Sequence, residues 1–280
     1  MSGKNFVSVV GFQGERGSYS EECISRFFGV KATPRAFRTL ADLFIALEDD
    51  EIKQALVPIE NSIEGSVTEA YDLLLKSSAN VNAEMNLRIV HCLISHQSVK
   101  KDQIRYVYSH PQALGQCRNY LRRFGREIIS TYDTAGSAKM VKEKGMMDAA
   151  AIASKRAAEV YGMQVLEEGI EDEENNFTRF FLLSKSESSS TGNDKTSIIF
   201  SASHKPGSLY EALSEFAKME INLTKIESRP TRRKAWEYNF YLDFEGHKED
   251  DRCNQVLETL SKKGNFLKIL GSYPKAKSKI

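Results

Sequence analysis

The chain has 280 residues, of which 41% are hydrophobic, and this is enough for about two domains with substantial cores. Its 39 basic and 38 acidic residues leave a net charge of +1, so charge gives no reason to expect a nucleic-acid partner. No apolar run is long enough to span a bilayer, and the start MSGKNFVSVVGF lacks the apolar core and cleavage site of a secretory signal. We therefore expect a cytoplasmic protein.

Strand-like and helical segments alternate along the first part of the chain. The expected strands cover residues 6–12, 54–58, 88–95 and 106–109, and the expected helices cover 20–28, 40–49, 113–124, 135–144 and 154–161. Strands and helices that alternate at this pace predict an α/β region with largely parallel sheets.

A change in composition divides the chain near residue 190. The stretch SESSSTGNDK at 186–195 has no apolar residue and predicts a linker. After it, strand, helix, strand, strand, helix and strand follow within about 80 residues, which is the ferredoxin-like order with two helices on one face of the sheet. We therefore expect a catalytic region at 1–185, a linker at 186–195 and a second domain at 196–273.

Signals for a metal or a cofactor are missing from the sequence. The four cysteines form no C-x-x-C pair, and the five histidines never fall at the spacing of H-E-x-x-H. The chain also contains no G-x-S-x-G elbow, no P-loop and no G-x-G-x-x-G. We expect no metal site and no cofactor, so any chemistry would use ordinary side chains.

Polar segments follow several expected strands, at the edge where α/β folds bind ligands. The turn GFQGERGSYSEE at 11–22 has backbone N–H groups that could hold a carboxylate, or it is only a tight connection. In VPIENSIEGSV, Glu60, Asn61 and Ser62 follow a strand, although Asn61 or Ser62 could instead cap a helix. In SHPQALGQC, Gln112 stands at the start of a helix.

The segment EDEENNFTRFFLL at 171–183 begins with four acids and continues into a strand. One interpretation is a solvated acidic loop before a buried strand. The other places Thr178 and Arg179 at the mouth of a cleft. Because neighbouring side chains in a strand point to opposite faces, only one of the two would then face the cleft. We expect that residue to be Thr178, and we expect the acids to stay in solvent.

These motifs together resemble one enzyme family. GERGSYSEE, VPIENSIEGSV, SHPQALGQC, AAIAS and NNFTRFF occur in the order found in prephenate dehydratases, and KPGSLYEAL with IESRP resembles the ACT regulatory domain. The likeness covers residues 5–273. It implies a two-lobed catalytic region like a periplasmic binding protein, followed by an ACT domain, that converts prephenate to phenylpyruvate in L-phenylalanine biosynthesis. An arogenate dehydratase and a non-catalytic sensor of amino or keto acids are the alternatives.

The resemblance also implies roles for particular residues. Thr178 matches the residue tied to catalysis, where it would hydrogen-bond the departing hydroxyl, with Glu60 or a water behind it. Asn61 and Gln112 match residues implicated in substrate handling, and the planar fork of Arg179 suits a substrate carboxylate. The expected substrate-binding set is Glu60, Asn61, Ser62, Gln112, Arg179 and Phe180.

Regulation by L-phenylalanine is expected at the second domain. The proposed effector site contains a helix start and a strand end: Gly207, Ser208, Leu209, Glu227, Ser228, Arg229 and Pro230. A simpler interpretation is that Gly207 only shapes a loop and Arg229 belongs to an exposed basic hairpin. Because the resemblance places the effector between ACT domains of paired subunits, we expect a homodimer or homotetramer.

Overall fold

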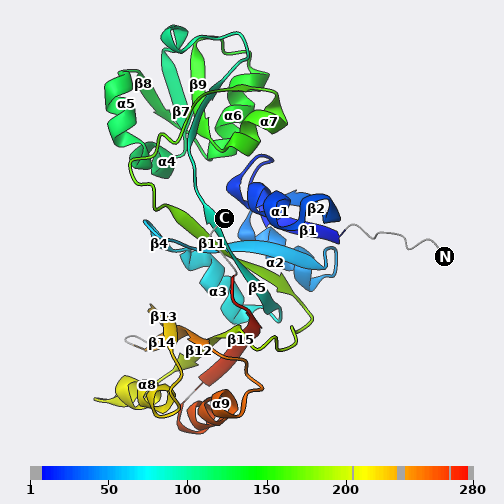
Figure 1. Cartoon of the computed structure of the whole chain (residues 1–280), viewed down its shortest axis with the longest axis vertical. Helices are drawn as coiled ribbons and strands as arrows, with labels where there is room; N and C mark the ends of the chain where they lie inside the picture. The colour runs from blue at the N-terminus through cyan, green and yellow to red at the C-terminus, as the bar shows by residue number, and fades with distance from the viewer. Residues whose placement is uncertain (1–7, 204, 232–236, 265, 277–280) are drawn as a thin grey trace, which may run out of the picture. The chain divides into compact units, whose positions relative to one another are not determined.

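The computed structural model describes residues 8–203, 205–231, 237–264 and 266–276, which form two compact units (Figure 1). Unit 1 takes in the chain up to Ala70 and Met85–Phe180, and unit 2 takes in Tyr71–Glu84 and most of the chain from Phe181 onward. No helix among the described residues is long and apolar enough to cross a membrane.

The first sheet has six strands in the order β2-β1-β3-β11-β5, with β4 paired to β3. Its strands are β1 (Ser8–Gln13), β2 (Ala32–Phe37), β3 (Gln54–Asn61), β4 (Gly65–Ser66), β5 (Asn80–Arg88) and β11 (Phe177–Ser184). The helices of this part are α1 (Tyr19–Phe28), α2 (Leu40–Glu48) and α3 (Thr68–Lys76), with a short 3₁₀ turn at Gly29–Lys31. β1 runs parallel to β2 and β3.

Side-chain caps fix where the first helices begin. Ser18 caps α1, because its hydroxyl accepts the backbone N–H of Glu21. Thr39 and Asp42 form a reciprocal capping box at the start of α2. The Ser18 cap marks the end of the turn between β1 and α1.

The second sheet has five strands in the order β10-β6-β9-β7-β8. Its strands are β6 (Cys92–Ser95), β7 (Tyr106–Ser109), β8 (Glu127–Ser130), β9 (Ala149–Ala153) and β10 (Gln164–Glu168). Its helices are α4 (Pro111–Gln116), α5 (Arg118–Phe124), α6 (Thr134–Glu143) and α7 (Lys155–Tyr161), with a 3₁₀ turn at Lys101–Gln103. β7 is parallel to β8 and β9, whereas β6 is antiparallel to β9 and β10.

Two sequence predictions differ from this arrangement in detail. The expected helix 113–124 is divided into α4 and α5 at Cys117, whose backbone (φ −113°, ψ 24°) leaves the helical region. The expected strand 88–95 is interrupted between β5 and β6, because the chain there leaves the first sheet and enters the second. It returns to the first sheet at β11, so two crossings join the lobes.

The turn before α1 packs tightly against the second lobe. The Ser154 hydroxyl donates to the carbonyl of Gly17 at 2.6 Å, and Arg156 pairs with the buried Glu21 at 3.2 Å. A Cβ added at Gly17 would lie 2.7 Å from the Cα of Ala157. Because a side chain has no room there, glycine allows this close approach between the lobes.

The C-terminal domain lies in unit 2 and contains a four-stranded sheet in the order β13-β14-β12-β15. Its elements are β12 (Asp194–Ser201), α8 (Ser208–Lys218), β13 (Leu223–Pro230), β14 (Tyr238–Glu245), α9 (Asp251–Lys263) and β15 (Phe266–Pro274). Both helices lie on the same side of the sheet (Figure 1), where Phe216, Val256 and Leu260 share a core with Phe200 and Phe244. The ferredoxin-like order is confirmed, and with it the expected two-part α/β fold class.

Residues from α3 also belong to unit 2. The Tyr241 hydroxyl donates to the carbonyl of Tyr71, and Lys268 donates from Nζ to the last carbonyls of α3, those of Leu74 and Leu75. A lysine on helix C-terminal carbonyls is favourable because it satisfies orphan acceptors and complements the helix dipole. The second half of α3 is therefore fixed to β15.

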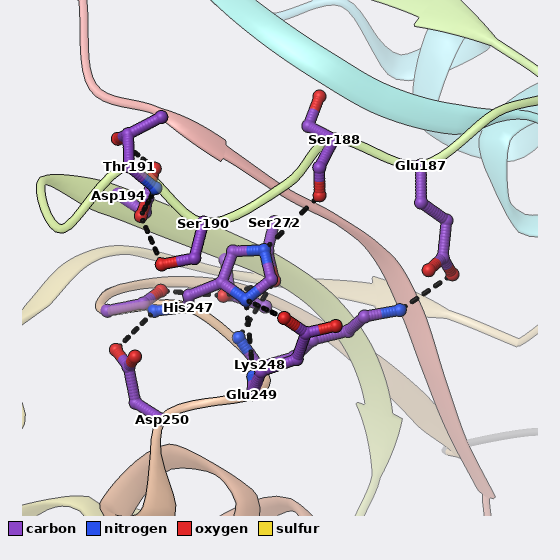
Figure 2. Close-up of polar contacts among 12 residues, drawn as sticks. Glu187, Ser188, Ser190, Thr191, Asp194, His247, Lys248, Glu249, Asp250 and Ser272 are labelled. Carbon is purple, nitrogen blue, oxygen red and sulfur yellow. Dashed lines mark hydrogen bonds and ion pairs between the residues drawn. The ribbon is translucent and has the colours of Figure 1, made fainter.

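The stretch expected as a linker is held on unit 2 by polar contacts (Figure 2). The Asp194 carboxylate accepts the N–H groups of Thr191 and Gly192. The buried His247, 1% exposed, accepts the Glu249 N–H at Nδ1, so its Nε2 donates to the Ser188 carbonyl at 3.4 Å. The expected domain boundaries stay a prediction.

Candidate functional site

A cavity of about 560 Å³ lies between the two lobes of unit 1. It is lined by the turn after β1, the β3–β4 hairpin, the start of α4, the loop before α6 and the first part of β11. Its lining includes Glu15, Ser18, Tyr19, Ser20, Asn61, Glu64, His91, Gln112, Gln116, Asp133, Thr178 and Phe180.

The structure brings some of the expected site residues to this cavity. Asn61, Gln112, Thr178 and Phe180 line it, whereas Glu60, Ser62 and Arg179 are not among the residues that line it. β11 is already regular strand at Thr178, so Arg179 points to the other face, as alternation predicts.

The expected residues outside the cavity have protein partners. Arg179 lies 3.8 Å from the carboxylate of Glu60 on the neighbouring strand. The Ser62 hydroxyl donates to the Asn175 carbonyl at 2.8 Å and accepts the Phe177 N–H at 2.9 Å. Their roles in substrate binding stay a prediction.

Asn61 is the centre of the polar network beneath the cavity. Its Oδ1 accepts the backbone N–H groups of Ile63 and Glu64 at 2.9 and 3.0 Å. Its Nδ2 donates to Asn176 Oδ1 at 2.7 Å and to Thr178 Oγ1 at 3.1 Å. Asn61 therefore closes the turn of the β3–β4 hairpin and is not a helix cap.

Sequence reasoning missed the residues that extend this network. Asn176 donates to Gln116 Oε1 at 2.9 Å, and His91 Nε2 lies 2.9 Å from the same oxygen. On the other side of the His91 ring, the Tyr19 hydroxyl lies 2.6 Å from Nδ1. Asn176 and Gln116 stand inside motifs already singled out, NNFTRFF and SHPQALGQC, so those motifs were a usable signal. Tyr19 and His91 had no comparable local signal for a shared hydrogen bond.

The acidic segment is not entirely in solvent, so that expectation is wrong for Glu171. Its side chain is 2% exposed, lies 3.5 Å from the Arg88 guanidinium and accepts the His91 backbone N–H at 2.9 Å. A buried carboxylate needs such partners because it loses hydration. Glu171 thus fixes the crossing segment that contains His91.

The cavity offers backbone N–H donors at the start of α1. Within the described part of the chain, the N–H groups of Tyr19 and Ser20 donate to no other residue. No lysine or arginine is among the described residues that line the cavity. A carboxylate bound here would therefore rely on the N–H groups and positive end of α1.

The acidic residues around the cavity each have a partner. Glu15 pairs with Lys139 at 3.0 Å, and Asp133 caps α6. Glu64 accepts from Gln116 Nε2 at 3.3 Å. Among the residues described, no cluster of three or more histidines, cysteines or acids could hold a metal ion.

Burial changes the acidity of two groups in the network. It lowers the pKa of His91, an effect that the hydrogen bond with Gln116 and the charge of Glu171 partly offset. It also raises the pKa of Tyr19 well above the usual value. Both groups are therefore neutral near pH 7.

The residues expected to bind an effector lie in the C-terminal domain. Gly207 is the N-cap of α8 with φ 86°, a conformation that favours glycine, and Ser208 and Leu209 open the helix. Glu227, Ser228, Arg229 and Pro230 end β13, an outer strand of the sheet, with Glu227 and Arg229 half-buried and the other two exposed. Their effector role stays a prediction.

Fold and site together define a two-lobed α/β binding region with a polar, carboxylate-compatible cavity, joined to a ferredoxin-like domain. The family model for prephenate dehydratase matches residues 10–188, and the ACT domain model matches residues 196–261. The chain therefore belongs to the prephenate dehydratase family.

Curated relatives agree with this assignment. The bifunctional chorismate mutase/prephenate dehydratase of Aquifex aeolicus is 40% identical over 270 residues, covering 95% of this chain and 74% of the relative. Arogenate dehydratase/prephenate dehydratase 1 of Arabidopsis thaliana, a chloroplastic protein, is 42% identical over 282 residues, covering 95% and 71%.

Two solved structures share the fold at 30% identity. One is the prephenate dehydratase of Arthrobacter aurescens in complex with L-Phe, with a TM-score of 0.88 and coverage of 97% of this chain and 91% of that one. The other, GqqA, is described as a novel type of quorum quenching acylase, with a TM-score of 0.89 and coverage of 96% and 98%.

Burial of His91 predicts a pH dependence of stability. The pKa in the folded chain lies below the ordinary value of about 6.5, so below that pH the unfolded chain binds more protons. The contribution of neutral His91 to the free energy of unfolding is complete above about pH 6.5. It is lost as the pH falls toward the pKa that His91 has in the folded chain. We expect the free energy of unfolding of the wild type, relative to His91→Gln, to fall in acid. Chemical denaturation across pH tests this, and a difference that stays flat or rises in acid contradicts it.

Proposed function

We propose that this protein catalyses the decarboxylative dehydration of prephenate to phenylpyruvate in the cavity of unit 1. The observation that carries the proposal is the hydrogen bond from Asn61 Nδ2 to Thr178 Oγ1 at 3.1 Å. Because the Thr178 oxygen accepts this bond, its own proton is available to a ligand in the cavity.

The chemistry of the reaction fits this arrangement. Loss of CO₂ and the ring hydroxyl from prephenate gives an aromatic ring, so most of the driving force lies in the substrate. The protein has to hold two carboxylates and donate a hydrogen bond to the departing hydroxyl. Thr178 supplies that donor, and the N–H groups of Tyr19 and Ser20 at the start of α1 receive a carboxylate.

The remaining expected residues divide into two groups in this proposal. Asn61, Gln112 and Phe180 line the cavity and contact the substrate or the residues that hold it. Arg179 acts through its contact with Glu60 on the opposite face of β3 and β11, and Ser62 fixes the chain just before Thr178. In this proposal Asn61 is the group that hydrogen-bonds Thr178 from the protein side, a role that the sequence analysis gave to Glu60 or a water. The cytoplasmic address stays a prediction.

Arogenate is a second candidate substrate, and one residue favours it. Glu64 lines the cavity, and Gln116 is the only partner of its carboxylate among the described residues. Arogenate carries an ammonium where prephenate has a keto oxygen, and a carboxylate attracts an ammonium. Some relatives are named arogenate dehydratases, such as that of Petunia hybrida at 40% identity.

The direct test is a rate assay of the purified protein with prephenate and arogenate in parallel. We expect release of phenylpyruvate from prephenate well above its spontaneous rate. Faster turnover of arogenate would make the protein an arogenate dehydratase. Turnover of neither would support the alternative of a non-catalytic sensor. The likeness to GqqA has less weight, because the dehydratase relatives are closer in sequence.

Replacing the Thr178 hydroxyl tests its role. Thr178→Ala should lower kcat by about 10²–10⁴-fold because the leaving group loses its donor. Thr178→Ser keeps the hydroxyl and should retain most of the activity. Both variants should keep the thermal unfolding midpoint of the wild type. Loss of folding together with activity in Thr178→Ala would make the residue structural, and unchanged kcat would remove it from catalysis.

We also propose that L-phenylalanine binds the C-terminal domain and inhibits the enzyme, and that the protein is a homodimer or homotetramer. Support comes from the ACT match and from the relative whose structure contains L-Phe. Support for coupling comes from α3, which the two units share. The segment just before α3, Gly65–Val67, lines the cavity. At the other end of α3, the carbonyls of Leu74 and Leu75 accept from Lys268 on β15.

A charge placed at Gly207 tests this effector site. Asparagine and aspartate both tolerate a positive φ, and a Cβ at Gly207 would meet no atom of the described residues within 4 Å. Gly207→Asp should repel the carboxylate of phenylalanine from the start of α8 and weaken its binding about tenfold. Gly207→Asn has the same size without the charge and should bind nearly as the wild type does. Equal affinity of the two variants by calorimetry would place the effector elsewhere.

A further inference from the structure

The amide orientations beneath the cavity follow from groups that can only donate or only accept. Asn61 Oδ1 faces the backbone N–H groups of Ile63 and Glu64, which only donate. Asn61 must therefore present its NH₂ group to Asn176, and Asn176 must receive it with its oxygen. Asn176 then points its own NH₂ group at Gln116.

Gln116 is fixed independently from its other side. Its Nε2 faces the carboxylate of Glu64 at 3.3 Å, and an ionised carboxylate only accepts. Its Oε1 therefore faces Asn176 and His91, both at 2.9 Å. Asn176 on one side and Glu64 on the other therefore require the same orientation of Gln116.

This orientation determines the tautomer of His91. An amide oxygen only accepts, so His91 Nε2 has to donate to Gln116 and carries the proton. In the neutral ring Nδ1 then accepts. The Tyr19 hydroxyl lies 2.6 Å from Nδ1 and 3.2 Å from the Val90 carbonyl, so its proton goes to the nearer acceptor, Nδ1. The ring is 2% exposed and meets the Tyr19 ring edge-on, with centroids 5.6 Å apart.

We propose that His91, held as the Nε2–H tautomer between Gln116 and the Tyr19 hydroxyl, is a positioning residue that pins Gln116 and, through Asn176 and Asn61, holds the Thr178 hydroxyl in place for the substrate. The amide oxygen of Gln116 receives two donors, and His91 supplies one of them. Without it the Gln116 side chain is held less firmly, and Asn176 loses the fixed acceptor of its NH₂ group. The Asn176 oxygen that receives Asn61 Nδ2 can then shift, although the backbone still sets which way the Asn61 amide faces. This inference rests on the proposed function and adds two positioning residues to it.

The chain offers a matched set of variants for the test. His91→Leu removes the donor, whereas His91→Gln places an amide N–H near the position of Nε2. His96→Leu is the control, because His96 also bonds a carbonyl, that of Val141 at 3.1 Å, and does not line the cavity. Steady-state rates and unfolding midpoints are measured for all three.

We expect His91→Leu to lower kcat about 10- to 100-fold with little change in KM, because a slightly misplaced donor slows the reaction more than it weakens binding. His91→Gln should recover most of that loss, and His96→Leu should keep the wild-type kcat whatever its midpoint. Wild-type kcat in His91→Leu overturns the proposal. So does a His91→Gln variant that is folded but as slow as His91→Leu.

A second readout does not depend on activity. Nitrogen-15 NMR of the wild type, with the His91 signals assigned by their loss in His91→Gln, should show a proton on Nε2 and none on Nδ1. A proton on Nδ1 overturns the proposal. If the wild type turns over neither substrate, the proposed function fails, and the NMR result still decides whether His91 has the orientation inferred here. Neither this spectrum nor His91→Gln requires that His91→Leu folds.

Discussion

The hydrogen bond from Asn61 to Thr178 is the interaction on which the site depends. It joins β3 to β11, two strands that come from segments 117 residues apart, and it decides that the Thr178 oxygen is an acceptor within the protein. The hydroxyl proton is then free for the cavity. Asn61 itself is fixed by backbone N–H groups of the β3–β4 turn, so the direction of the amide that faces the Thr178 hydroxyl follows from backbone geometry. Preorganised donors of this kind cost no reorganisation during the reaction.

The fold supports this arrangement from both lobes. The chain crosses to the second lobe next to His91 and returns next to Asn176, and the two side chains meet at Gln116 on α4. The buried Glu171 holds the first crossing through the His91 backbone N–H. The polar network is thus assembled where the lobes join, and loss of one member would affect residues of both.

Most of the fold was predictable from the sequence because its elements have local signals. The ferredoxin-like domain follows from strand and helix patterns of the expected lengths. The break between α4 and α5 was not predictable, because the residues on both sides of Cys117 continue a helical pattern. β6 lies within the expected strand 88–95, but its antiparallel direction was not predictable because strand direction depends on the crossings between the lobes. β10 was not among the expected strands.

The site was predictable only where a motif contains it. Thr178, Asn61 and Gln112 stand in segments that resemble the family, and all three line the cavity. Arg179 and Glu60 stand in the same segments, but strand alternation turns Arg179 to the other face, where it contacts Glu60. His91 is 25 residues from Gln116 and 72 residues from Tyr19 in the sequence. A local sequence pattern could therefore not predict that these three side chains are in contact. Glu171 was expected in solvent because its partner Arg88 also lies far from it in the sequence.

The central claim is that Thr178 donates to the hydroxyl that leaves the substrate. A crystal structure of the protein with a stable prephenate analogue that retains this hydroxyl tests the claim most directly. The account predicts Thr178 Oγ1 within hydrogen-bond distance of the analogue's hydroxyl, with Asn61 Nδ2 still donating to Thr178. An analogue bound in the cavity with its hydroxyl facing another group, and Thr178 in contact only with the protein, would contradict it.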